Sequence, residues 1–99
     1  MTSRVLLLHG LWMRPASMAL LASRLARAGF APERIGYASV RGNPEFAIRE
    51  LQREMRSAPC HVVAHSLGGL VTLTALEREP DLPVLRVVCL GSPLCGSAA

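Results

Sequence analysis

The chain has 99 residues, of which 51% are hydrophobic and 18% are charged. This length corresponds to one small domain, because soluble domains usually contain ~100–200 residues. The apolar content excludes an intrinsically disordered chain, and three cysteines are too few for a disulfide-stapled mini-protein.

The formal net charge is +4, and all eleven basic residues are arginines. They are spread from Arg4 to Arg86 and only 4% of the residues are aromatic, so we do not expect a nucleic-acid partner. Cys60, Cys89 and Cys95 lack the spacing of a metal site, and we expect reduced thiols and a cytoplasmic protein. No apolar run approaches the ~20 residues of a transmembrane helix, and no secretory signal is predicted.

Apolar runs and amphipathic segments alternate along the chain. The predicted strands are residues 4–8, 35–40, 60–64 and Val84–Leu90. The predicted helices are residues 15–28, 44–58 and 67–79. Gly29 is expected to close the first helix in left-handed geometry, and Glu45 to pair with Arg49 on the second.

Alternating strands and helices indicate an α/β domain that spans residues 1–99, with a parallel sheet between two helical layers. If the winding direction reverses after the second strand, the four strands lie in the order 2-1-3-4. The first and third strands then meet at a topological switch point, where ligands bind outside the carboxyl ends of the strands.

Residues 64–68, with the sequence AHSLG, join a predicted strand to a predicted helix. Such a sharp turn needs small residues around a central serine, and it projects the Ser66 hydroxyl above the sheet edge. The following helix directs its free N–H groups to the same point, so the Leu67 N–H is the expected first oxyanion donor. The loop after the first strand, with the sequence HGLW at residues 9–12, would supply the Leu11 N–H as the second donor.

These motifs resemble those of the α/β-hydrolase superfamily, specifically its small lipase- and esterase-like members. The resemblance rests on the strand that ends in His-Gly, on HSLGG at residues 65–69 and on LGSPLCGS at residues 90–97. It extends from about Arg4 to Ser97. The chain departs from the family pattern at Ala64, where the first elbow glycine is expected, and at residues 94–95, where a His-Arg pair is common. The resemblance implies hydrolysis of a small-molecule or lipid ester through an acyl-Ser66 intermediate, without a cofactor or metal.

In this family the catalytic acid and histidine follow the nucleophile. No histidine follows Ser66 in this chain, and the one aspartate, Asp81, precedes the fourth strand. Seven strand residues would place it roughly 20 Å from the elbow. The chain therefore resembles a partial hydrolase fold that lacks the C-terminal part, and its activity alone is in question.

Several simpler interpretations stay open. Ser66 could serve only as a helix N-cap, and Trp12 could line an acyl pocket or merely cover the sheet edge. A different class of function is a catalytically silent α/β module that works only with a partner chain. The apolar strand Val84–Leu90 is predicted at a sheet edge, where we expect self-association.

Overall fold

The computed structural model describes residues 3–8, 15–35, 44–65 and 67–90. The elements in chain order are β1 (Ser3–Leu8), α1 (Pro15–Arg27), β2 (Phe30–Ile35), α3 (Pro44–Ser57), β3 (Cys60–His65), α4 (Leu67–Arg78) and β4 (Val84–Leu90). None of the helices in these described parts is long and apolar enough to cross a membrane.

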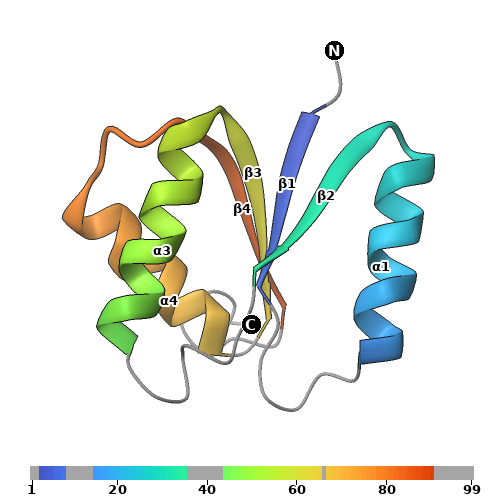
Figure 1. The fold of residues 1–99 in the computed structure, drawn as a ribbon, viewed down its shortest axis with the longest axis horizontal. Coiled ribbons are helices and arrows are strands. Elements are labelled where there is room, and N and C mark those ends of the chain that lie inside the picture. Colours follow the sequence, from blue (N-terminus) through green and yellow to red (C-terminus); the bar gives the residue numbers. More distant parts are fainter. Residues whose placement is uncertain (1–2, 9–14, 36–43, 66, 91–99) are drawn as a thin grey trace.

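The four strands form one parallel sheet in the order β2-β1-β3-β4. Helix α1 covers one face of the sheet, and α3 and α4 lie side by side on the other (Figure 1). The three-layer α/β architecture and the strand order predicted from the sequence are therefore confirmed. The winding direction reverses between β1 and β3, as expected.

The second strand begins five residues earlier than predicted. It is Phe30–Ile35 rather than residues 35–40, and residues 36–40 lie outside the described part of the chain. Gly29, with φ at +96°, closes α1 as expected and turns the chain directly into β2. Pro32 and the two charged residues after it argue against a central strand, but an edge strand tolerates a missing N–H group.

Strand β1 is apolar on both sides because both of its faces are covered. Leu6 and Leu8 pack into the larger core beneath α3 and α4, whereas Val5 and Leu7 pack into the smaller core beneath α1. All four side chains are buried. A central parallel strand of this kind reads as a continuous hydrophobic run, which is why its sequence predicts it well.

One arginine joins three elements at the amino end of the sheet. The Arg4 Nε donates a hydrogen bond of 2.6 Å to Glu33 on β2, and its Nη2 contacts the Glu54 carboxylate on α3 at 3.0 Å. Its Nη1 also donates to the carbonyl oxygens of Glu54 and Ala58, at 2.8 and 3.0 Å. The hydrogen bond with Glu33 raises the pKa of the Arg4 guanidinium, which stays charged. The charge also complements the partial negative end of α3.

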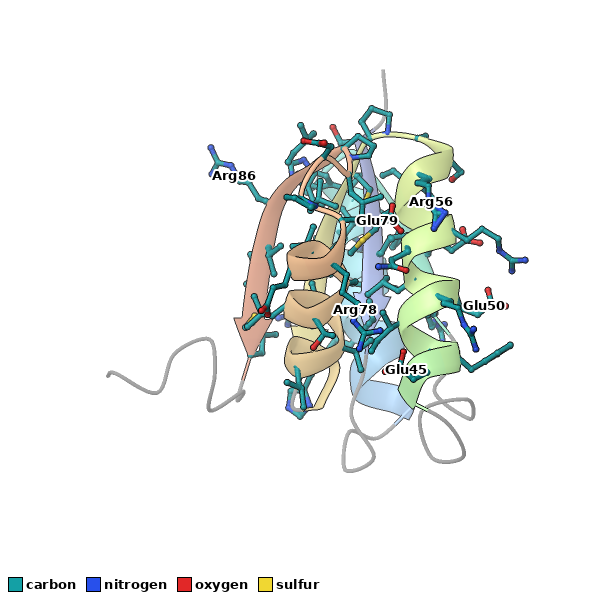
Figure 2. The ribbon with its side chains drawn as sticks, turned by 90° about the vertical axis from the view of Figure 1, so that its left-hand side faces the viewer. Glu45, Glu50, Arg56, Arg78, Glu79 and Arg86 are labelled. Carbon is teal, nitrogen blue, oxygen red and sulfur yellow. The ribbon has the colours of Figure 1, made fainter. Side chains whose placement is uncertain are left out.

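Three polar contacts between described residues, one buried and two exposed, join α3 to α4 and the residue after it. The Gln52 side-chain amide donates to the Ala75 carbonyl at 3.2 Å, away from solvent. Arg56 pairs with Glu79 at 3.1 Å, and Arg78 donates to Glu45 at 2.8 Å (Figure 2). Glu45 therefore forms its ion pair with Arg78 on the neighbouring helix, whereas its predicted partner Arg49 acts on it through its charge. The pKa of Glu45 is lowered first by the hydrogen bond from Arg78, while the charge on Arg49 adds a smaller effect.

The cysteines depart from the expectation of reduced thiols. Cys60 is free and buried. Cys89, however, is disulfide-bonded. The expectation is therefore wrong at Cys89 and correct at Cys60.

We expect Arg4→Met to lower the free energy of unfolding by about 2–3 kcal/mol, because it leaves two carboxylates and two carbonyl oxygens without their shared donor. Arg53→Met is the matched control. Arg53 is 70% exposed and, among the described residues, forms an ion pair with Glu50 within its own helix, so its loss should cost about 0.5 kcal/mol or less. Urea unfolding followed by circular dichroism measures both. Equal losses would show that Arg4 does not organise this end of the sheet.

Candidate active site

The predicted nucleophile turn lies where β3 meets α4. Strand β3 ends at His65 and α4 begins at Leu67, so a single residue connects the strand to the helix. The pairing of Leu8 with Ala64 brings the carboxyl end of β1 beside the carboxyl end of β3. Position 66 therefore follows the strand at the switch point of the sheet, where a ligand has room outside the strand ends.

Of the four predicted site residues, one lies in the described part of the chain and three lie outside it. Leu67 is the first residue of α4, so its backbone N–H belongs to the first turn, whose N–H groups have no partner within the helix. Ser66, Leu11 and Trp12 lie outside the described residues. Their roles as nucleophile, second oxyanion donor and substrate-binding residue stay predictions.

Small buried residues flank the turn on both sides. Ala64 is fully buried and lies between Leu8 on β1 and Cys89 on β4. Gly68 and Gly69, in the first turn of α4, are also buried. This burial is compatible with the sharp strand-to-helix turn that the sequence motif predicts, with an alanine in place of the first glycine.

Thr72 is a buried polar residue of α4 that the sequence analysis did not single out. Its hydroxyl donates to the Gly68 carbonyl at 2.8 Å, one turn earlier in the same helix. A threonine four residues after a helix-initial glycine is a signal for this bond, because threonine hydroxyls commonly bond the carbonyl four residues back. The bond satisfies a polar group in the helix that begins at the turn.

The histidines on β3 face away from the larger core. Side chains alternate along the strand, so Ala64 faces α3 and α4 while His61 and His65 face the α1 side. The Nδ1 atom of His65 is buried and has no hydrogen-bond partner in the described part of the chain. His61 lies at the opposite end of β3, and its ring meets Phe30 edge-on with centroids 6.0 Å apart. This contact gives His61 a packing role at the amino end of the sheet.

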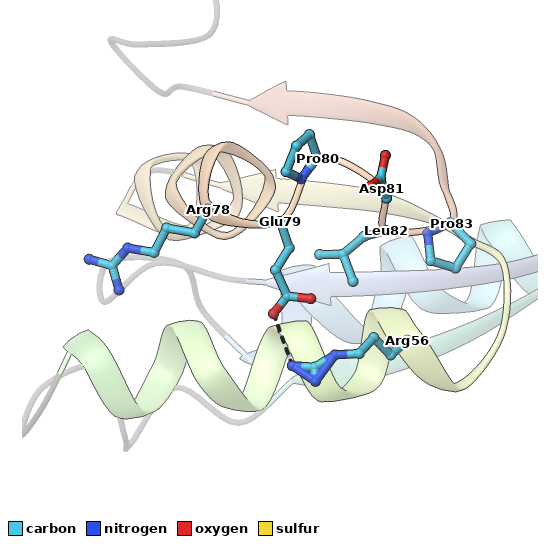
Figure 3. Close-up of a pocket in the computed structure, with 7 residues that line it drawn as sticks. All are labelled: Arg56, Arg78, Glu79, Pro80, Asp81, Leu82 and Pro83. Atoms are coloured by element: carbon cyan, nitrogen blue, oxygen red, sulfur yellow. Dashed lines mark hydrogen bonds and ion pairs between the residues drawn. The ribbon is translucent and has the colours of Figure 1, made fainter.

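Asp81 lies far from the turn. It belongs to the connection between α4 and β4, at the amino end of the sheet, and lines a cavity of about 440 Å³. Figure 3 shows this cavity, in which Arg56 and Glu79 form an ion pair. All of β4 separates Asp81 from the carboxyl edge, so it cannot orient a catalytic base there.

Two other kinds of site are also excluded among the described residues, a cysteine nucleophile and a metal site. Cys60 lies at the amino end of β3, and burial raises the pKa of its thiol, so it is a poor nucleophile. Within the described ranges, no three His, Cys, Asp or Glu side chains gather as a metal site would require. What these residues do provide is a helix N-terminus and a tight strand-to-helix turn.

The sequence profile of the alpha/beta hydrolase family matches residues 5–99. Among solved structures, the chain is similar to a monoacylglycerol lipase from Paleococcus ferrophilus, with a TM-score of 0.63 and 26% sequence identity. The similarity covers 95% of this chain and 41% of the lipase, so the chain spans less than half the length of that enzyme. A search of curated proteins found no match.

We expect Ala64→Val to lower the free energy of unfolding by about 1–3 kcal/mol, because the added methyl groups have no room in the buried space between β3 and α4. Val63→Ile is the matched control on the opposite face of the same strand, where the side chain borders an open cavity. It should change stability by less than about 1 kcal/mol. Urea unfolding compares the two variants, and an Ala64→Val protein as stable as the control would show spare space at the turn.

Proposed function

Because the chain belongs to the alpha/beta hydrolase family, we propose that it carries the nucleophile of a serine hydrolase that cleaves carboxylic esters through an acyl-Ser66 intermediate. The observation that supports this most directly is the single-residue turn between β3 and α4, beside the end of β1. A helix N-cap would explain a serine before α4, but it would not require small residues on both sides of it.

In the proposed reaction the Ser66 hydroxyl oxygen attacks the ester carbonyl carbon while its proton passes to a base. The carbonyl oxygen becomes an oxyanion, which accepts hydrogen bonds from the backbone N–H groups of Leu67 and Leu11. Expulsion of the alcohol, which takes up the proton, leaves the acyl-serine ester, and water then releases the carboxylic acid. One such donor typically contributes about 3–4 kcal/mol to transition-state stabilisation.

Acylglycerols and related carboxylic esters are the proposed substrates. The similar lipase supports this class, since its structure matches nearly the whole of this chain. Trp12, predicted in the loop after β1, would lie next to the acyl group. A single oxyanion site and a serine nucleophile need no cofactor.

The cytoplasmic location predicted from the sequence stays a prediction. The free thiol of Cys60 is compatible with it, but this thiol is buried.

A fluorophosphonate probe tests the nucleophile. We expect the folded chain to be labelled at Ser66 slowly, over hours at high probe concentration. The oxyanion donors stabilise the negative charge that develops on the phosphonate, but no base among the described residues activates the hydroxyl. Ser66→Ala should abolish the label, whereas Ser57→Ala, at an exposed serine of α3, should leave it unchanged. Mass spectrometry of the labelled peptide measures both. If the folded chain takes no label, the silent interaction module becomes the better interpretation.

We expect the isolated chain to hydrolyse a short activated ester only weakly. No acid–base pair faces the turn among the described residues, and a serine hydroxyl without a base is a weak nucleophile at neutral pH. The oxyanion site and substrate binding alone would leave roughly 10³–10⁴-fold acceleration over water. A rate typical of enzymes that is lost in Ser66→Ala would show that a base has been overlooked, and His9→Ala would then identify or exclude that histidine.

A further inference from the structure

An apolar cavity lies between helix α1 and the two strands that α1 leaves uncovered, β3 and β4 (Figure 1). Its volume is about 420 Å³, which is in the range of small-molecule sites. Six of the described residues that line it are apolar: Val5, Leu25, Phe30, Val62, Val63 and Val88. Val88 is 49% exposed, so an apolar group that covers it would be stabilised by its removal from water.

The other two described residues of the lining are His61 and Arg86, whose side chains can donate hydrogen bonds. Both lie toward the amino ends of their strands. No acidic side chain is among the described lining residues, and Arg86 forms no ion pair with a described residue. The cavity therefore combines an apolar interior with a positive charge that no described carboxylate neutralises.

A register irregularity in β4 brings Arg86 to this cavity. Cys60 on β3 pairs with Val84 on β4. Two residues later Val62 pairs with Val87, so β4 contains one extra residue here. Val84 and Val87 both pack against the larger core beneath α3 and α4. With regular pairing Arg86 would stand opposite Val62 and face that core, because side chains alternate along a strand. The extra residue instead turns Arg86 to the α1 side, and β-bulges commonly re-aim a side chain in this way.

We propose that this cavity binds a medium-chain alkyl carboxylate, with its chain over Val63 and Val88 and its carboxylate on Arg86. Figure 2 shows the Arg86 side chain extending outward from β4, so the carboxylate lies at the mouth of the cavity, in contact with water. A guanidinium suits a carboxylate because two of its N–H groups can donate in parallel to the two oxygens. One guanidinium also balances one negative charge, which favours a carboxylate over a doubly charged phosphate monoester.

This site is separate from the proposed ester site. Position 66 follows the carboxyl end of β3, whereas His61 is the second residue of that strand. The carboxylic acid released by the proposed reaction belongs to the same chemical class as the ligand. Binding in the cavity nevertheless does not depend on Ser66 as a nucleophile, because the lining residues include none of the groups assigned to catalysis.

Isothermal titration calorimetry with octanoate, decanoate and decanol tests the proposal. We expect decanoate to bind about fifteenfold more tightly than octanoate, because each buried methylene group contributes a factor of about four. Decanol has the same chain length without the charge. It should bind about fivefold more weakly than decanoate, since it cannot form the ion pair with Arg86.

Substitutions of Arg86 test the charge. Arg86→Gln should weaken decanoate binding by the same factor of about five and leave decanol binding unchanged. Arg86→Glu should reverse the preference, so that decylammonium binds more tightly than decanoate. Arg53→Gln is the matched control, since Arg53 is 70% exposed on α3 and lies outside the cavity lining. Circular dichroism confirms that each variant is folded.

Ser66→Ala distinguishes this cavity from the ester site, and we expect it to leave decanoate binding unchanged. If Ser66→Ala abolishes decanoate binding while Arg86→Gln binds normally, the acid occupies the ester site and the proposal is wrong. Equal affinities of the wild-type chain for decanoate and decanol, or no decanoate binding at millimolar concentration, would also overturn it. A Ser66 that takes no fluorophosphonate label would change none of these results, so the two proposals fail independently.

Discussion

The arrangement of this sheet depends on the guanidinium of Arg4. It lies near the start of the central strand β1 and binds carboxylates from β2 and α3, together with two carbonyl oxygens near the end of α3. Three elements that are distant in sequence are thus fixed at the amino end of the sheet. The backbone pairing of β1 with β3 in turn places the carboxyl ends of these two strands side by side. The candidate nucleophile turn follows β3 at that carboxyl end, opposite the end that Arg4 holds together.

The sequence predicts the parts of this fold that are determined by local pattern. The buried strands β1 and β3 and the amphipathic helix α3 have clear apolar patterns, and β4 is apolar apart from Arg86. The strand order follows from the reversal of winding once these elements are placed. Gly29 marks the end of α1 because a positive φ is readily adopted only by glycine. For the same reason, the residue types around position 66 identify a tight turn without reference to the rest of the chain.

The features that the sequence did not predict depend on tertiary contacts. Strand β2 contains a proline and two charged residues, and it is a strand because it pairs with β1 while Arg4 neutralises Glu33. Glu45 binds Arg78 on the neighbouring helix rather than Arg49 on its own, since the packing of α3 against α4 brings that guanidinium within reach. The disulfide state of Cys89 could not be derived from spacing alone. The chemistry of Ser66, Leu11 and Trp12 stays a prediction because they lie outside the described residues.

Helices cover the two faces of the sheet unequally, and the uncovered half of one face extends to the candidate site. Four strands about 4.8 Å apart span a width that takes roughly two helices of ~10 Å diameter. Helices α3 and α4 fill one face, whereas α1 lies over β1 and β2 and leaves the other half of its face to β3 and β4. On this open half lie Val88 and, at the carboxyl end of β3, His65, whose buried Nδ1 atom has no hydrogen-bond partner among the described residues. Any protein layer that covers the open half therefore comes within reach of the residue next to position 66.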